Sequence, residues 1–485
     1  MPNDSISPKT EQRWSLYVFA ALLSLLIIGG GAFAVRNTEI VRKIAGTSQK
    51  EDVLLPVVQG SEETLPLTAE IYMARAEEAL AAGDPSNAIL SYEKTIERGG
   101  ELPVMRKLFD AALLAGDTDK AEAAIGLMAF RGTPENVLEA LRGFVLIRQN
   151  NLTGARALFE KEPLRGDSRF GLLLVSILEG NHGEAKEHLS ILQTSTDPLM
   201  VTFARVVQGA YDEFALFEDD GRDEHLRTLL ARSLGQIGQW PIVEQILEEV
   251  VSSEPDYRDA EILLGVARLM MGLPADALEA LEHAYSLDPE KAETQYFLGL
   301  AHERLGHEEE ATTFLSYALQ NGFAEKRVLR EKLAELAEKR GAYEEAIGQY
   351  RAMVDEGNAT AQDYRALALL LVEHRKDPDQ ARALALEAKE KFGESSVEAL
   401  HLMGWTAMLN DQLDEAASYL RTATEQDPTL AIAWYHRGLL EEKVGDREQA
   451  ITSFRRAYEE SIGRDETIAM DAAQRHNALL MQNGE

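Results

Sequence analysis

The feature that most constrains this chain is a short residue pattern that recurs about every 34 residues between positions 69 and 462. In each copy a turn residue, usually glycine, is followed five positions later by a small residue. An aromatic residue or leucine comes four positions after that in most copies. A unit of this length is a pair of helices that can bury its apolar face only against its neighbours. The pattern therefore predicts a stack of helix pairs, whose function lies on a surface and not in an enclosed pocket.

Eleven copies can be aligned on the turn residue and the small residue. Glycine or asparagine tolerates the left-handed backbone that ends the first helix, and alanine lets the second helix approach the first closely. The aligned pairs are Gly83 and Ala88, Gly116 and Ala121, Asn150 and Ala155, Gly180 and Ala185, Gly238 and Val243, Gly272 and Ala277, Gly306 and Ala311, Gly341 and Ala346, Lys376 and Ala381, Asp411 and Ala416, and Gly445 and Ala450.

These residues resemble the tetratricopeptide repeat, whose pattern is W-x2-L-G-x2-Y, then A-x3-F, then P. The resemblance is regular over residues 224–462 and weaker over 69–197, where Phe109 and Leu173 replace the small residue of the first helix. It implies an all-α fold, a right-handed superhelical solenoid of about eleven helix pairs. It also implies that the chain binds protein partners and is not an enzyme.

One interval breaks the period, because Gly180 and Gly238 lie 58 positions apart. We expect residues 198–223 to form an irregular insertion or hinge, most simply a degenerate repeat that has lost a helix. The segment DETIAMDAAQRHNALLM at 465–481 predicts a capping helix, so that residues 463–485 close the stack with a helix and a tail.

The N-terminal region predicts a membrane anchor. After a tail at 1–13, residues 14–35 contain no charged residue and are long enough to span a bilayer. Ala32, Phe33 and Ala34 also fit the cleavage site of a signal peptide, so an exported soluble protein is the alternative. Small residues at a spacing of four within 14–35 fit a helix-dimer face, which leaves a homodimer open. Residues 36–66 contain Pro56, Gly60 and Pro66 and suggest a tether.

Charge and composition narrow the class of partner. The net charge of −33 disfavours nucleic acid and favours a partner segment that is amphipathic or flanked by basic residues. There are no cysteines, and the spacing of His302 and His307 does not match a zinc motif on one helix face, so we expect no metal, cofactor or catalytic residues.

The resemblance also indicates where a partner would bind. In this family the inner face is lined by first-helix residues three before, one after and four after the small residue. Charged residues that would clamp a carboxylate are missing there, which leaves an apolar floor with an acidic rim and with Glu331 and Glu335 interrupting it. The predicted floor consists of Ile262, Val266, Leu269, Tyr296, Leu300, Leu370, Trp405, Met408, Tyr435 and Leu439. The predicted rim consists of Asp259, Glu293, Glu303, Asp363, Glu373, Glu398 and Glu442.

The leading hypothesis is therefore a single-pass membrane scaffold of a bacterial envelope, secretion or export complex. The expected location is the inner membrane with the repeat body in the periplasm, and a cytoplasmic body stays open because Arg36, Arg42 and Lys43 closely follow the apolar segment. The alternatives are the exported soluble adaptor or chaperone, and an accessory subunit of an enzyme complex.

Overall fold

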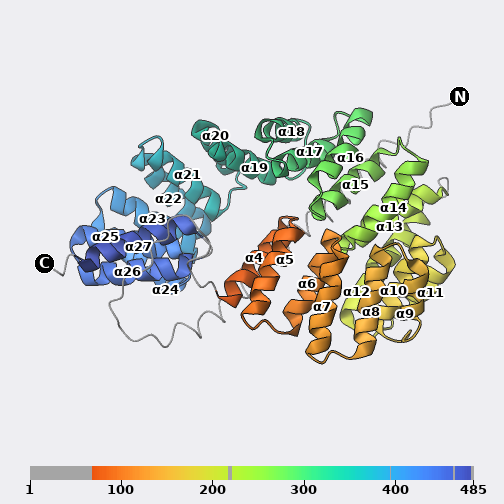
Figure 1. The fold of residues 1–485 in the computed structure, drawn as a ribbon. Coiled ribbons are helices and arrows are strands. Elements are labelled where there is room, and N and C mark those ends of the chain that lie inside the picture. The colour runs from red at the N-terminus through yellow and green to blue at the C-terminus, as the bar shows by residue number, and fades with distance from the viewer. Residues whose placement is uncertain (1–67, 217–220, 394, 463–464, 482–485) are drawn as a thin grey trace. The chain divides into compact units, whose positions relative to one another are not determined.

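The computed structural model describes residues 68–485 apart from 217–220, 394, 463–464 and 482–485. Every regular element in that part of the chain is an α-helix (Figure 1). The helices form eleven antiparallel pairs, with α12 and α27 as additional single helices. They fall into two compact units, residues 68–324 and 325–485. The predicted segments 1–13, 14–35 and 36–66 lie outside the described residues, and none of the described helices is both long and apolar enough to cross a bilayer.

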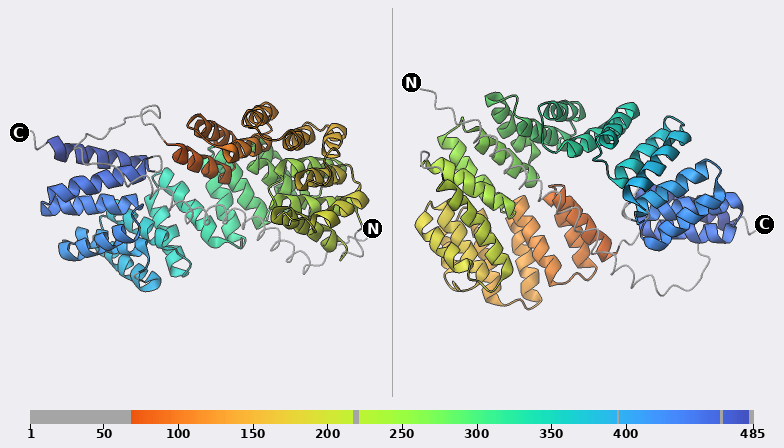
Figure 2. Two further views of the ribbon diagram at one scale, coloured as in Figure 1. Left: turned by 90° about the horizontal axis from the view of Figure 1, so that it is seen from below. Right: turned by 180° about the vertical axis from the view of Figure 1, so that it is seen from behind.

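The first unit contains fifteen helices. They are α4 (Ala69–Ala81), α5 (Pro85–Glu97), α6 (Leu102–Ala115), α7 (Thr118–Phe130), α8 (Glu135–Arg148), α9 (Leu152–Phe159), α10 (Gly166–Leu178), α11 (His182–Leu192), α12 (Pro198–Phe214), α13 (Asp223–Gln236), α14 (Trp240–Ser253), α15 (Arg258–Met270), α16 (Pro274–Leu287), α17 (Ala292–Arg304) and α18 (Glu308–Gln320). Figures 1 and 2 show that these helices curve round until α4 and α5 lie beside α15 and α16.

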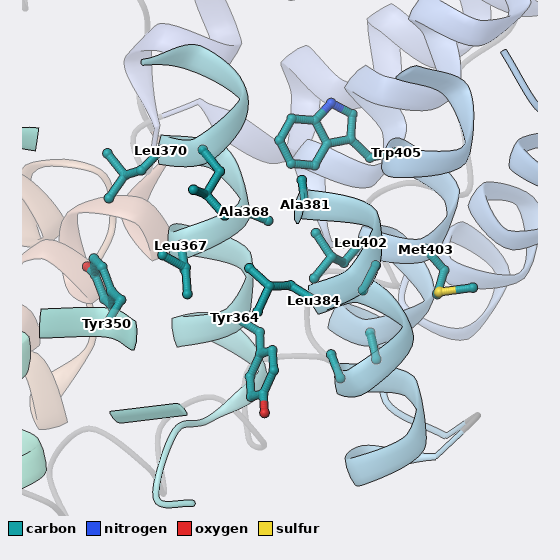
Figure 3. Close-up of a cluster of buried hydrophobic side chains, with 14 of the residues drawn as sticks. Tyr350, Tyr364, Leu367, Ala368, Leu370, Ala381, Leu384, Leu402, Met403 and Trp405 are labelled. Carbon is teal, nitrogen blue, oxygen red and sulfur yellow. The ribbon is translucent and has the colours of Figure 1, made fainter. Parts of the chain in front are cut away.

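The second unit contains four helix pairs and a final helix. They are α19 (Lys326–Lys339), α20 (Tyr343–Asp355), α21 (Ala361–Glu373), α22 (Pro378–Phe392), α23 (Val397–Leu409), α24 (Leu413–Gln426), α25 (Ala431–Val444), α26 (Arg447–Ser461) and α27 (Glu466–Met481). Buried side chains from α19 to α25, including Tyr364, Leu402 and Met403, form a continuous apolar core (Figure 3). Helix α27 packs on α26 through Ala472 and Ala473, in the segment where the sequence predicts a cap.

The turn within each pair has the predicted backbone. All eleven predicted turn residues have φ between 56° and 83°, the left-handed region that glycine adopts most easily. In six pairs the next residue is Asp or Asn, and its side chain accepts a hydrogen bond from a backbone N–H in the first turn of the second helix. These caps are Asp84, Asp117, Asn151, Asn181, Asp377 and Asp446.

The eleven predicted small residues are all fully buried within the pairs. Each of them is 0% exposed. The small residue of the first helix is equally constrained where it is glycine: a Cβ added to Gly404 would lie 2.7 Å from Leu420 Cγ, and one added to Gly438 would lie 2.8 Å from Phe454. The period of the sequence is therefore the period of helix-to-helix packing.

The interval 198–223 contains one regular 17-residue helix, α12, which packs against both α11 and α13. Among the described residues of this interval no second helix follows it, and the interpretation as a hinge or a degenerate repeat stays a prediction. The boundary between the two compact units lies elsewhere, after Ala324.

Candidate functional site

The first helices of the pairs in the second unit lie side by side. Helix α21 contacts α23, α23 contacts α25, and α25 contacts α27. In each pair, the small residue of the first helix lies against the second helix. The residues next to that small residue in the first helices form a common inner face. In α19, α21, α23 and α25 the small residues are Ala334, Ala368, Gly404 and Gly438, all of them buried.

Helix α21 differs by one residue from the register that the position of its turn residue predicts. The left-handed turn residue follows Gly404 and Gly438 by seven positions, but Lys376 follows Ala368 by eight. The start of the helix gives the same register, because the N-caps Thr360 and Ser396 precede Ala368 and Gly404 by equal distances. The turn after α21 thus contains one extra residue. In that register the positions of α21 that correspond to the inner face are Arg365, Leu369 and Val372, one residue before the predicted Leu370 and Glu373. That Leu370 and Glu373 contact a partner stays a prediction.

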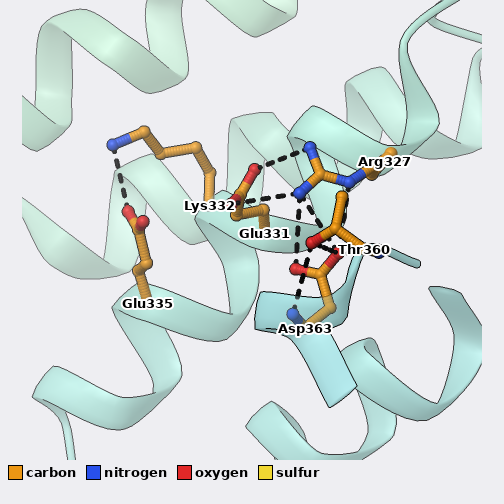
Figure 4. Close-up of polar contacts among 6 residues, drawn as sticks. All are labelled: Arg327, Glu331, Lys332, Glu335, Thr360 and Asp363. Atoms are coloured by element: carbon orange, nitrogen blue, oxygen red, sulfur yellow. Dashed lines mark hydrogen bonds and ion pairs between the residues drawn. The ribbon is translucent and has the colours of Figure 1, made fainter. Parts of the chain in front are cut away.

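Asp363, predicted as part of the acidic rim, has a structural role (Figure 4). It is 2% exposed and completes a capping box, accepting hydrogen bonds from the backbone N–H of Thr360 at 2.7 Å and the Thr360 hydroxyl at 2.8 Å. Arg327 of α19 pairs with the same carboxylate at 3.1 Å. A carboxylate whose lone pairs are filled in this way is not available to a partner.

Trp405 and Met408 of α23 lie on the predicted face but are buried, at 5% and 7% exposure. The Trp405 ring stacks on the imidazole of His436 in α25, with centroids 5.1 Å apart and an interplanar angle of 7°. His436 in turn lies 2.8 Å from His401, nitrogen to nitrogen. Trp405 therefore joins α23 to α25, and Met408 is part of the buried core. Tyr435 and Leu439 of α25 are half-buried, and Glu398 and Glu442 reach solvent.

Arg365 is the residue that sequence reasoning missed. Its positive charge lowers the pKa of both His401 and His436, after the larger effect of burial, so the guanidinium lies close to this imidazole pair. Within the described part of the chain it forms no hydrogen bond or ion pair, and it is only half-buried. Leu369, one turn further along α21, is 40% exposed, and Leu409 of α23 is 37% exposed. Aligning α21 with α23 on their N-cap residues, Thr360 and Ser396, would have placed Arg365 at an inner-face position.

The neighbouring helix α19 is acidic on the same face. Glu331 pairs with Arg327 at 3.2 Å, and Glu335 pairs with Lys332 at 3.1 Å (Figure 4). Burial raises the pKa of Glu331 and also that of Glu338, whose carboxylate accepts a hydrogen bond from Tyr350. The face of the second unit thus passes from carboxylates on α19, through one unpaired cation on α21 and the buried side chains of α23, to the half-buried Tyr435 and Leu439 on α25.

The predicted floor residues of the first unit are mostly covered. Ile262, Val266, Leu269 and Tyr296 are each at most 6% exposed, and Leu300 is half-buried. The predicted rim residues Asp259 and Glu293 pair with the adjacent Arg258 and Lys291, at 3.0 and 3.7 Å, and Glu303 is half-buried. That these residues contact a partner stays a prediction, but the structure presents no open apolar floor there.

No group of three or more side chains within the described residues is arranged to hold a metal ion. His302 and His307 nevertheless face each other across their turn, with their Nδ1 atoms 3.3 Å apart. The His302 ring also stacks on Phe314 at 5.4 Å, so its surroundings are those of a packed side chain.

Comparisons with known proteins agree with this architecture. Two tetratricopeptide repeat family models match the chain, over residues 262–324 and 306–470. No curated protein matches the sequence. Among solved structures, yeast Tom70 is 14% identical and aligns over 86% of this chain and 96% of its own, with a TM-score of 0.34. PilF of Pseudomonas aeruginosa is 21% identical over 43% of this chain and 95% of its own, with a TM-score of 0.35.

A third similar structure is YrrB, described as a TPR protein with an unusual peptide-binding site. It is 20% identical over 47% of this chain and 97% of its own, with a TM-score of 0.26. At these identities and TM-scores the likeness carries no information on function. The family matches, together with the turn geometry and the buried small residues, show that residues 262–470 consist of tetratricopeptide repeats.

Proposed function

We propose that this chain is a scaffold that binds a protein partner on the inner face of its second unit. The observation that carries the proposal is the unpaired Arg365 beside the solvent-exposed Leu369, on a face that continues through the half-buried Tyr435 and Leu439. An exposed apolar strip next to an unpaired cation is costly in isolation, and a partner that covers both removes the cost.

The charges on this face indicate the chemistry of the partner. The face has carboxylates at both sides, on α19 and at Glu398 and Glu442, and one cation without an ion pair, Arg365, near its middle. The carboxylates Glu331, Glu335 and Glu442 each have a single paired cation, which leaves further oxygen lone pairs for a partner. We therefore expect an amphipathic segment whose basic flanks lie against the carboxylates and whose apolar side chains lie over Leu369 and Leu439. A carboxylate or backbone carbonyl of that segment would accept hydrogen bonds from Arg365.

Site-specific photo-crosslinking in the native cell tests this proposal. A benzophenone amino acid placed at Leu369 or Leu439 should give an adduct with one defined protein. The same residue at Leu386, which is 52% exposed on α22, is the matched control and should give none. The added substitution Arg365→Glu should remove the adducts. Equal adducts from Leu369 and Leu386, or adducts that survive Arg365→Glu, would contradict the proposal.

We also propose that residues 14–35 anchor the scaffold in a membrane and that residues 36–66 tether it. The support is the run of 22 uncharged residues between Arg13 and Arg36. With a periplasmic body at the bacterial inner membrane, the scaffold would assemble an envelope, secretion or export complex. Mass spectrometry of the protein from membrane fractions tests the anchor, which requires an N-terminus that retains residues 14–35.

A mature N-terminus directly after Ala34 would instead support the exported soluble adaptor, which the sequence Ala32-Phe33-Ala34 favours. Protease added to spheroplasts tests the side of the membrane separately. Loss of the repeat body before lysis supports the periplasmic location, and protection until lysis contradicts it.

A further inference from the structure

Two ends of the first unit meet at a single small junction. The turn between α4 and α5 lies against the turn between α15 and α16 and against the end of α17 (Figure 1). A Cβ added to Gly83 would lie 2.6 Å from both Nη atoms of Arg304, and one added to Gly272 would lie 2.9 Å from Pro85 Cδ. Arg304 also donates a hydrogen bond to the backbone carbonyl of Leu269. Residues about 190 to 220 positions apart are therefore in direct contact, which nearest-neighbour stacking of repeats does not produce.

The burial of the α4–α5 turn marks this junction as unusual. Gly83 and Pro85 are buried, whereas the turn glycines Gly306 and Gly341, which lie outside the junction, are exposed. Both glycines of the junction have left-handed backbones, with φ of 68° at Gly83 and 75° at Gly272. The close approach of the two turns thus depends on residues without a Cβ on either side.

A second set of contacts links the middle of the same unit across its inside. Arg148 at the end of α8 pairs with Glu244 of α14 at 3.5 Å, and Arg268 of α15 pairs with the same carboxylate at 3.6 Å. Gln245 donates a hydrogen bond to the carbonyl of Ile147 at 3.3 Å. Helix α14 also contacts α6 and α10, so it lies over the first helices of three earlier pairs.

The contacts described at the junction are those of Gly83 with Arg304, of Gly272 with Pro85 and of Arg304 with the carbonyl of Leu269. The buried cluster of the first pairs runs from Ala76 to Val145, and the half-buried side chains packed against it also belong to α4–α8. Arg304 is half-buried and forms no ion pair among the described residues, and burial lowers its pKa. A closure held by a few hydrogen bonds and a desolvated cation is easier to break than the packing within a helix pair.

We propose that the first unit opens and closes at this junction, and that the contacts of Arg304 with Gly83 and with the carbonyl of Leu269 hold it closed. In the closed form, α14 covers the inner face of α6, α8 and α10. In the open form the α4–α5 pair separates from α15–α17 and that inner face becomes accessible. This inference concerns the first unit alone and does not rest on the function proposed for the second.

Distance measurements between two spin labels in the full-length chain test whether Arg304 holds the junction closed. The chain contains no cysteine, so Ser86→Cys on α5 and Glu279→Cys on α16, both exposed positions, give two unique labels. We expect one narrow distance distribution in the otherwise unchanged chain. Arg304→Ala should add a broad population at longer distance, and Gly83→Ala should do the same because its Cβ displaces the guanidinium.

Gly238→Ala is the matched control, since Gly238 has a φ of 75° in the same unit but no atom near its missing Cβ. It carries the backbone strain alone and should leave the distribution unchanged. If circular dichroism shows that Arg304→Ala loses helix content, Arg304→Met takes its place. Methionine keeps the aliphatic part of the side chain and removes only the guanidinium. An unchanged distribution after removal of the guanidinium, or an equal change in Gly238→Ala, would overturn the proposal.

Discussion

The imidazole pair His401 and His436 makes the second unit sensitive to acid. Burial holds both rings in the neutral form: it lowers the pKa of His436 to about 3 and that of His401 well below its ordinary value. In the unfolded chain both titrate near a pKa of about 6.5. Below that pH only the unfolded chain binds these protons, so the free energy of unfolding falls as the pH falls.

The size of the effect follows from this linkage. Between about pH 7.5 and pH 5.0, a histidine that stays neutral when folded removes about 2 kcal/mol of stability, and the pair removes roughly 4 kcal/mol. Urea unfolding of the full chain measures it, followed by the fluorescence of its four tryptophans, of which Trp405 stacks on His436. The double substitution His401→Gln and His436→Gln should reduce the pH dependence by that amount.

The matched control is His374→Gln, which removes an exposed histidine from the end of α21 in the same unit. This variant should lose as much free energy of unfolding between pH 7.5 and pH 5.0 as the unchanged chain does, within about 0.5 kcal/mol. If the double variant loses as much stability on acidification as the unchanged chain, the argument that both rings are neutral and buried is wrong.

Three further predictions concern stability, each measured by urea unfolding of the full chain. Lys376→Gly should raise stability by about 1 kcal/mol, since a lysine holds φ at 57° there, and no gain would show that the turn is unstrained. Gly438→Ala should cost about 1–3 kcal/mol by clashing with Phe454, whereas Gly348→Ala, with open space around it, should be neutral or stabilising. Asp363→Ala should cost about 3 kcal/mol, because it leaves Arg327 without its most buried partner, and a loss below about 1 kcal/mol would contradict that role.

The sequence predicted the helix pairs well because their determinants are local. A left-handed turn residue and a small residue five positions later fix the packing of two adjacent helices, and all eleven predicted pairs of positions have the expected backbone and burial. The candidate site was harder to predict. The turn at Lys376 contains one extra residue, which shifts the inner-face register of α21 from Leu370 to Leu369 and places Arg365 on that register. The turn residue is a lysine and not a glycine, so the sequence pattern does not mark the extra residue.

Burial between repeats was less predictable still. Trp405 occupies an inner-face position by sequence, but whether such a side chain meets solvent or the next first helix depends on the twist between pairs. The contact between Gly83 and Arg304 depends on the twist accumulated over many pairs. The repeat pattern does not predict the accumulated twist, because the residues of each repeat determine only its contacts with the neighbouring repeats.

The proposed binding face is tested most directly by the affinity of the crosslinked partner segment, prepared as a labelled peptide, for the purified repeat body. Fluorescence anisotropy should show that Arg365→Glu weakens binding at least about tenfold, as expected for a reversed charge at a central contact. Arg421→Glu, the same change at an exposed arginine of α24, should alter Kd by less than about twofold. Equal affinity of the Arg365→Glu variant and the unchanged protein would contradict the account.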